Sequence, residues 1–249
     1  MRTALAILLS TLTVPILTQA ELQFDLSSVS SWADDTGDWE DVGDTYQTGD
    51  DGKRLGTKEG KDVIVNGPTG RTVNLVSGLE YADQRLHIEF MVPKGSNSGV
   101  YLLGRYEVQI LDSWGVEKPQ SSDCGGIYQR YNEKEGYGYE GTAPNTNASK
   151  APGEWQSFDI KFQAPKFDDA GKKIANAKFI EVKHNGVIVH KNVEVTGPTR
   201  SAAFEDEQPR GPLMLQGDHG PVAYRNIRME INTNIQPRNR TRTVSKDPK

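Results

Sequence analysis

Cysteine is nearly absent from this chain, since Cys124 is the only one among 249 residues. A single thiol cannot form an internal disulfide, whatever the redox state of its compartment. A nucleophilic thiol would need a base beside it, and the neighbouring residues SSDCGGIY offer only Asp123. The sequence therefore predicts a packed structural cysteine and excludes a disulfide-based scaffold.

Helical periodicity is also missing, as are the motifs of nucleotide and metal chemistry. Beyond residue 20 there is no convincing helical stretch, no phosphate-binding glycine loop, no His-x-x-x-His pair and no internal repeat. Basic residues are not in excess either: the net charge is -5 and the sequence pI is about 5.5. This charge disfavours nucleic acid as a partner.

Short alternating segments separated by turn residues fill most of the chain instead. Between two such segments, Asn185 and Gly186 form a two-residue signal for a β-hairpin with a primed turn, because both residues tolerate positive φ. The pattern predicts an all-β protein, with a single antiparallel β-sandwich of the jelly-roll kind over residues 21–235. The predicted strands are 63–65, 84–92, 96–102, 105–112, 155–162, 178–184, 187–195, 213–216 and 224–231.

Two stretches have no clear strand pattern. Residues 21–60 read as loop-rich and acidic, and their Trp32, Trp39 and Tyr46 are either core anchors or platforms for stacking a sugar. The sequence leaves both roles open. Residues 113–153 are rich in glycine, tyrosine and asparagine, and irregular segments of this length usually carry function.

The two ends of the chain differ from its middle. Residues 1–20 resemble a secretory signal, with Arg2, the mostly apolar run 4–17 and the small-residue cleavage pattern 18–20. We therefore expect export to the periplasm or the medium, with no transmembrane span once the signal is removed. Residues 236–249 form a basic tail without an apolar pattern, for which disorder is expected.

The segment SNSGVYLLGRYEVQILD, residues 96–112, contains the first group of candidate site residues. Alternation in its second strand separates an apolar face, Tyr106, Val108 and Ile110, from a polar face, Arg105, Glu107 and Gln109. A β-bulge would be needed to bring Asp112 onto the face of Glu107. Structural roles stay open for both carboxylates, since Glu107 could pair with a neighbour and Asp112 could cap the following turn.

The second group lies in QGDHGPVAYRNI, residues 216–227. His219 stands between Asp218 and Gly220 at a predicted strand end, and Arg225 follows six residues later. A histidine in this position can act as a general acid or base near neutral pH. A purely structural Asp-His turn that fixes the loop is the alternative.

Three motifs resemble those of the 3-keto-disaccharide hydrolase family, in the same order: YADQRLHIEFMVPKG, SNSGVYLLGRYEVQILDS and LQGDHGPVAYRNIRMEI. The resemblance spans Leu22–Ile231 and implies a concanavalin A-like jelly roll, a domain common in exported bacterial proteins. It also implies action on sugars already oxidised at C3. The ketone acidifies the C2 hydrogen, so a base can remove it, the C1 substituent leaves by β-elimination, and water adds to the enone.

Such a reaction needs a base, an acid for the leaving oxygen, and a cationic or hydrogen-bonding group at the enolate. In the matching motifs, His219 or Glu107 would transfer the protons, and the sequence does not decide which is the base. Arg105 and Gln109 would hold sugar oxygens or the enolate. The candidate catalytic residues are Glu107, His219 and Asp112, and the candidate substrate-binding residues are Arg105, Gln109, Tyr101, Asp218 and Arg225.

Two other functions stay open. A laminarinase-type endo-glucanase has Glu-x-Asp followed two or three residues later by Glu on one strand, whereas this chain has Gln109 and Asp112 in the second and third places. A lectin-like module would bind carbohydrate in the same groove without reacting. No cofactor is evident; a structural calcium ion is compatible with concanavalin-like folds by analogy, but no residues place one. The oligomeric state does not follow from the sequence.

Overall fold

The computed structural model describes residues 21–33, 35–232 and 238–239. Regular structure in these residues is almost entirely β-strand, with one 3₁₀ turn, η1 (Val29–Ser31). The expected all-β fold is therefore confirmed. No helix in this part of the chain is long and apolar enough for a membrane span. The predicted signal, residues 1–20, lies outside the described residues.

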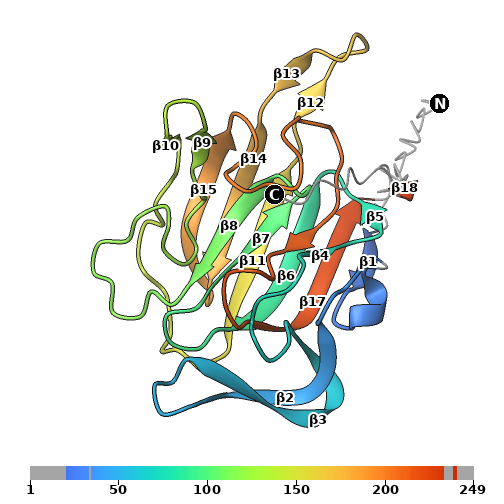
Figure 1. Ribbon diagram of the computed structural model, residues 1–249. Helices are drawn as coiled ribbons and strands as arrows, with labels where there is room; N and C mark the ends of the chain where they lie inside the picture. The colour runs from blue at the N-terminus through green and yellow to red at the C-terminus, as the bar shows by residue number, and fades with distance from the viewer. Residues whose placement is uncertain (1–20, 34, 233–237, 240–249) are drawn as a thin grey trace, which may run out of the picture.

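Two antiparallel sheets lie face to face and form a sandwich (Figure 1). The larger has eight strands in the order β15-β14-β11-β6-β17-β3-β2, with β1 paired to β17. Its strands are β1 (Glu21–Asp25), β2 (Glu40–Thr48), β3 (Arg54–Val65), β6 (Gln84–Met91), β11 (Gln156–Gln163), β14 (Ala177–His184), β15 (Val187–Val195) and β17 (Ala223–Asn232).

The smaller sheet has the order β4-β16-β7-β8. Its strands are β4 (Leu75–Val76), β16 (Met214–Leu215), β7 (Asn97–Leu102) and β8 (Tyr106–Leu111). Three two-stranded ribbons complete the fold: β5 (Leu79–Glu80) with β18 (Arg238–Asn239), β9 (Arg130–Asn132) with β10 (Tyr137–Tyr139), and β12 (Lys166–Phe167) with β13 (Lys173–Ala175).

The hydrophobic core fills the space between the two sheets. The apolar face predicted for β8 points into it, and so do the alternating apolar residues of β6 and β11. Each large apolar side chain buried in this way stabilises the fold by about 1.5–3 kcal/mol. The core residues from these three strands are Tyr106, Val108, Ile110, Leu86, Ile88, Phe90, Phe158, Ile160 and Phe162.

The predicted hairpin turn is confirmed. Asn185 and Gly186 join β14 to β15 with φ angles of 51° and 80°, as a primed turn requires. The predicted packing of Cys124 is also confirmed, because the thiol is buried and burial raises its pKa to about 12.

Residues 21–60 do not form the loop-rich region that their sequence indicates. They contain β1, β2 and the first half of β3, and β2 and β3 pair along a ribbon at the bottom of Figure 1. Much of this ribbon is solvent-accessible on both faces, so it lacks the apolar alternation that identifies a half-buried strand. Trp32 and Trp39 are core anchors, whereas Tyr46 is 47% exposed.

The tail also departs from expectation at one point. Arg238–Asn239 forms the short strand β18, which pairs with β5, although the sequence predicts disorder over 236–249. The other residues of that tail lie outside the described residues.

Candidate active site

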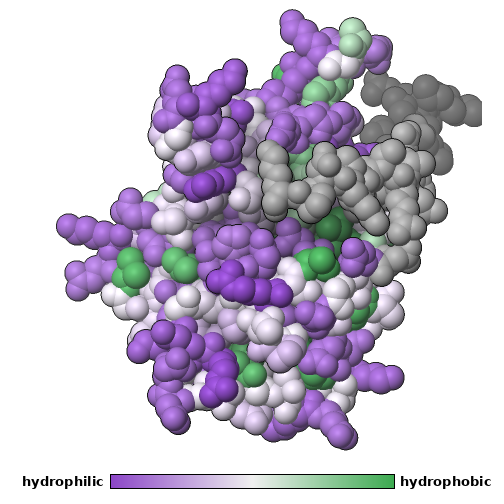
Figure 2. Space-filling view, viewed as in Figure 1, coloured by the Kyte–Doolittle hydropathy of each residue, from purple (hydrophilic) through white to green (hydrophobic). Residues whose placement is uncertain are grey.

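The outer face of the small sheet carries a pocket of about 180 Å³. Figure 2 shows this face as mainly hydrophilic, with isolated hydrophobic residues. Residues from five separate parts of the chain line the pocket: Asn97 and Tyr101 of β7, Glu107 and Gln109 of β8, Tyr128, Arg200 and Ser201 of two loops, and Gln216 and His219 of the segment between β16 and β17. Four residues singled out in the sequence, Tyr101, Glu107, Gln109 and His219, are thus brought together.

Strand register explains why the first three share a face. β7 and β8 pair without interruption, placing Tyr101 opposite Glu107 and Gly99 opposite Gln109. Side chains in a strand alternate between faces, so Glu107 and Gln109 point outward while Val108 between them enters the core. The polar row predicted from the sequence therefore lines a pocket at these two positions.

Glu107 is a buried carboxyl group, with only 2% of its surface exposed. Burial raises its pKa to about 8; the Tyr101 hydroxyl opposes this rise and the nearby Asp218 carboxylate adds to it. At neutral pH the group is therefore largely protonated and can donate a proton. Its Oε2 has no hydrogen-bond partner among the described residues, and such an atom at a pocket wall is available to a ligand.

Gln109 holds the other oxygen of this carboxyl group. In the amide orientation that satisfies its neighbours, its nitrogen donates to Glu107 Oε1 at 2.9 Å and to the Ser98 carbonyl oxygen at 3.2 Å. Gln109 is itself buried. It therefore orients Glu107 as a neutral partner, without the like-charge repulsion that a second carboxylate would introduce.

Gly99 provides the space that Glu107 occupies. A Cβ atom at Gly99 would lie 2.1 Å from Glu107 Oε1, far inside van der Waals contact. Gly99→Ala is therefore expected to destabilise the fold by about 1–3 kcal/mol through overpacking. Gly78→Ala is the matched control, because a Cβ there meets nothing within 4 Å. Chemical denaturation of both variants checks this; equal stabilities would show that the carboxyl group is not seated against Gly99.

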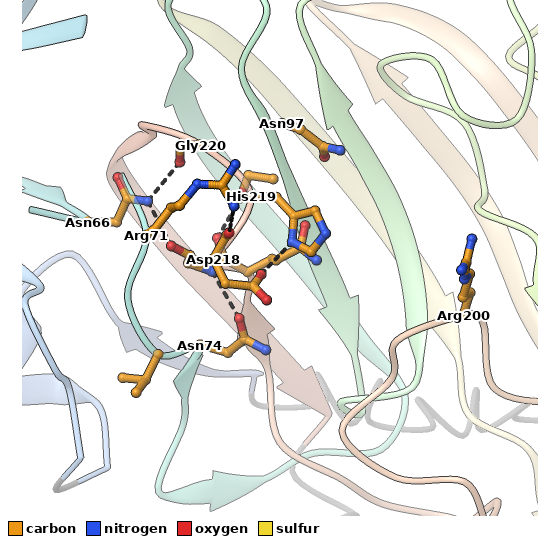
Figure 3. Close-up of polar contacts among 12 residues, drawn as sticks. Asn66, Arg71, Asn74, Asn97, Arg200, Asp218, His219 and Gly220 are labelled. Carbon is orange, nitrogen blue, oxygen red and sulfur yellow. Dashed lines mark hydrogen bonds and ion pairs between the residues drawn. The ribbon is translucent and has the colours of Figure 1, made fainter. Parts of the chain in front are cut away.

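The His219 turn is held from the neighbouring loop. The side chain of Asn66 is buried and donates to the carbonyl oxygens of Gly217 (3.0 Å) and Gly220 (2.8 Å). Arg71 Nη1 donates to the Asp218 carbonyl oxygen at 3.0 Å. These contacts, drawn in Figure 3, fix the backbone on both sides of the histidine.

His219 and Asp218 form a close pair, with Nδ1 and Oδ1 separated by 2.5 Å. When Nδ1–H donates its hydrogen bond to the carboxylate, the lone pair of the neutral ring is on Nε2, so this ring nitrogen can act as a base. The imidazole is about half exposed and lines the pocket. Arg200 and Asn97, which are labelled with it in Figure 3, line the same pocket.

Arg105 does not contribute to the pocket. It lies in the turn before β8, where Nη2 and Nε bind the Asp206 carboxylate and carbonyl oxygen, each at 2.6 Å. Nη1 donates to Leu103 O at 2.8 Å, and the guanidinium lies 4.5 Å from the Phe204 ring centroid. These contacts occupy all three guanidinium nitrogens in fixing a loop. This geometry contradicts the prediction that Arg105 contacts the sugar.

Asp112 is also outside the pocket. The bulge that would have turned it toward Glu107 is absent, because the β7–β8 register is regular from Leu102↔Tyr106 to Asn97↔Leu111. Its carboxylate accepts the backbone N–H groups of Gly95 at 2.8 Å and Trp114 at 3.4 Å. Asp112 therefore has the turn-capping role that was the alternative to catalysis.

Arg225 lies on the large sheet, on the opposite side of the sandwich from the pocket. Its neighbour Tyr224 points into the core, so alternation turns Arg225 outward. There Nε donates to Glu89 at 2.7 Å and the guanidinium stacks 4.0 Å from the Trp155 ring centroid. The prediction that Arg225 binds substrate is not supported by this position.

Sequence reasoning missed five of the lining residues. Asn97 and Gln216 lie inside the recognised motifs, and Asn97 shares the parity of Tyr101, so alternation could have identified it. Tyr128, Arg200 and Ser201 come from irregular loops, where no periodic signal exists. No three His, Cys, Asp or Glu side chains of the described chain converge as a metal site.

A β-sandwich with a polar pocket on the outer face of one sheet offers hydrogen-bonding groups to a small polar ligand. The comparisons give a more specific result. The model of the 3-keto-α-glucoside-1,2-lyase-like domain matches residues 19–230, and the chain belongs to this family. The family resemblance found in three sequence motifs is thereby confirmed, and with it a glycosyl hydrolase-like class of protein.

A solved structure agrees on the fold. A suspected glycosyl hydrolase from Parabacteroides distasonis superposes with a TM-score of 0.55 at 24% identity, covering 88% of this chain and 94% of that one. A second suspected glycosyl hydrolase from the same organism has a TM-score of 0.46 at 21% identity, covering 77% and 98%. A comparison with curated proteins found no match.

Proposed function

We propose that this protein cleaves the glycosidic bond of 3-keto-glycosides, including 3-keto-disaccharides, by C2 proton abstraction and β-elimination followed by hydration. The observation that carries the proposal is the pairing, in one pocket, of the buried Glu107 carboxyl group with the His219–Asp218 pair. These groups correspond to an acid and a base. Membership of the lyase-like family supports the same chemistry.

The reaction can be written so that every proton is accounted for. His219 Nε2 takes the C2 proton, and the electron pair of the broken C–H bond forms an enolate with the C3 ketone. The enolate collapses to an enone as the C1–O bond breaks, and Glu107 gives its proton to the leaving oxygen. Water then adds to C1, Glu107 takes a proton from it, and protonated His219 returns a proton to C2.

Arg200 takes the role for which Arg105 was predicted. Among the described residues that line the pocket, Arg200 carries the guanidinium group. Its positive charge would stabilise the negative charge that develops on the enolate oxygen. Asn97 and Gln216 supply amides for the sugar hydroxyl groups. The proposal thus assigns each required function to a residue of the pocket.

A conventional retaining glucanase fits this pocket less well. It requires two carboxyl groups about 5–5.5 Å apart, and Glu107 is the one carboxylate among the described lining residues. Gln109 and Asp112 do not supply the second, the former being an amide and the latter a turn cap.

For cellular location we propose export, on the pattern of residues 1–20.

The assay that tests the function uses a 3-keto-glycoside in deuterated water, with the unoxidised glycoside as the control substrate. Product release from the keto sugar, together with deuterium at C2, is the expected result. Cleavage of unoxidised β-glucan without C2 exchange would instead identify a glucanase. Binding of either sugar without turnover would identify a lectin-like module.

A further inference from the structure

The pocket is half open to solvent, and its volume of about 180 Å³ lies below the roughly 300–1,000 Å³ of pockets that enclose drug-sized ligands. A disaccharide bound here would therefore extend beyond the pocket. If the protein cleaves 3-keto-disaccharides, as proposed above, the leaving sugar must lie outside, along one wall.

The two proton-transfer groups lie toward different ends of the pocket. The His219 turn packs beside the start of β7, since a Cβ on Gly220 would meet Ser96 and the backbone nitrogen of Asn97. Asn97 pairs with Leu111, the last residue of β8, whereas Glu107 pairs with Tyr101 near the start of that strand. The leaving oxygen takes its proton from the acid, so the leaving group departs at the Glu107 end.

Two loops meet the Glu107 backbone at that end. Tyr128 N–H donates to the Glu107 carbonyl oxygen at 3.1 Å, and the Glu107 N–H donates to Thr199 Oγ1 at 3.2 Å. The residue after Thr199 is Arg200, whose N–H donates to Gln129 O at 2.9 Å. The wall beside the acid is therefore tied directly to the strand that carries the acid.

This wall continues outward as a stacked pair. The Arg200 guanidinium lies 3.9 Å from the ring centroid of Tyr131, which belongs to β9 in the β9–β10 ribbon. Ser201, next in the turn, has a φ of 61°, a conformation that a residue other than glycine adopts only when its surroundings impose it. The turn is thus built to present Arg200 between the pocket and the tyrosine.

We propose that the Arg200–Tyr131 stack is the binding platform for the leaving sugar. The flat apolar face of a pyranose ring would rest on the stack, while its hydroxyl groups reach the guanidinium. Because Arg200 also serves the enolate of the keto ring in the proposed reaction, the part of the platform specific to the leaving group is the Tyr131 ring.

Trp114 is the competing platform, at the opposite end. It follows β8, is 60% exposed, and is not among the residues that line the pocket. It lies near the His219 end, where the leaving oxygen would be distant from the acid. Trp114→Ala is therefore the matched control for Tyr131→Ala.

The test compares kcat/KM for a 3-keto-disaccharide with kcat/KM for the methyl 3-keto-glucoside, which has almost no leaving group to stack. Tyr131→Ala is expected to lower this ratio roughly tenfold, equivalent to ~1.4 kcal/mol of lost stacking. Tyr131→Phe, which keeps the ring, and Trp114→Ala are both expected to retain the wild-type ratio.

Other outcomes overturn the platform. A ratio unchanged in Tyr131→Ala, or lowered instead in Trp114→Ala, assigns the leaving sugar elsewhere; an equal loss in Tyr131→Phe rules out stacking by the ring. Failure of the proposed function looks different, because the wild-type protein would then turn over neither keto substrate.

Discussion

Glu107→Gln is expected to slow release of the leaving group by about 10²–10⁴-fold while the C2 hydrogen still exchanges with solvent. The amide keeps the shape of the carboxyl group but cannot give a proton to the leaving oxygen. Enolate formation at C2 needs only the base, so exchange without cleavage should accumulate. Parallel measurement of product and of C2 deuterium in deuterated water checks both parts.

The outcome that would contradict this assignment is equally specific. If Glu107→Gln abolishes exchange together with cleavage, Glu107 is the base rather than the acid. If it unfolds the protein instead, the carboxyl group has a packing role. Thermal denaturation of the variant distinguishes these two outcomes.

Stability should also depend on pH through Glu107. The pKa of Glu107 is about 8 in the folded protein and about 4.3 in an unfolded chain. Between pH 4.3 and pH 8, roughly, the folded state therefore holds a proton that the unfolded state does not. The free energy of unfolding therefore falls as pH rises through this window, by ~1.4 kcal/mol per pH unit from this group. Glu107→Gln removes this dependence, and its stability relative to wild type should be greater at pH 8 than at pH 5.

The sequence located half of the pocket because a strand has a strict period. Alternation placed Glu107 and Gln109 outward and Val108 inward, and the register of β7 then supplied Tyr101. The alternation of side chains between faces gave the wrong position for Arg105, because β8 begins only at the following residue. Leu103 and Gly104, with φ angles of 55° and 65°, turn the chain just before it. A period cannot be extended through such a turn.

The other half of the pocket arises from long-range contacts that no local pattern encodes. Tyr128 and Thr199 are about 20 and 90 residues from Glu107, yet both bind its backbone. For Arg225 the local sequence was misleading. Its closeness to His219 in the sequence suggested a shared site, but Arg225 lies on β17, which belongs to the other sheet. Its core neighbour Tyr224 instead has its hydroxyl 2.7 Å from Ser98 Oγ, across the sandwich.

His219→Ala is expected to slow both C2 exchange and cleavage by on the order of a hundredfold or more, because no base then remains to form the enolate. The imidazole is about half exposed and its turn is held through backbone contacts, so the thermal midpoint should change little. This double loss differs from the exchange-competent Glu107→Gln variant, and the pair of results separates base from acid.

A second histidine offers a matched control for this experiment. His87 also has a carboxylate at Nδ1, with Asp159 Oδ1 at 2.7 Å, but lies on the large sheet outside the pocket. His87→Ala removes an equivalent His–Asp hydrogen bond and should retain exchange and cleavage. Asp218→Asn tests the orientation of the catalytic ring, since an amide nitrogen facing Nδ1 would favour the tautomer whose Nε2 is protonated. A partial loss of exchange is expected there, and full exchange in His219→Ala would place the base elsewhere.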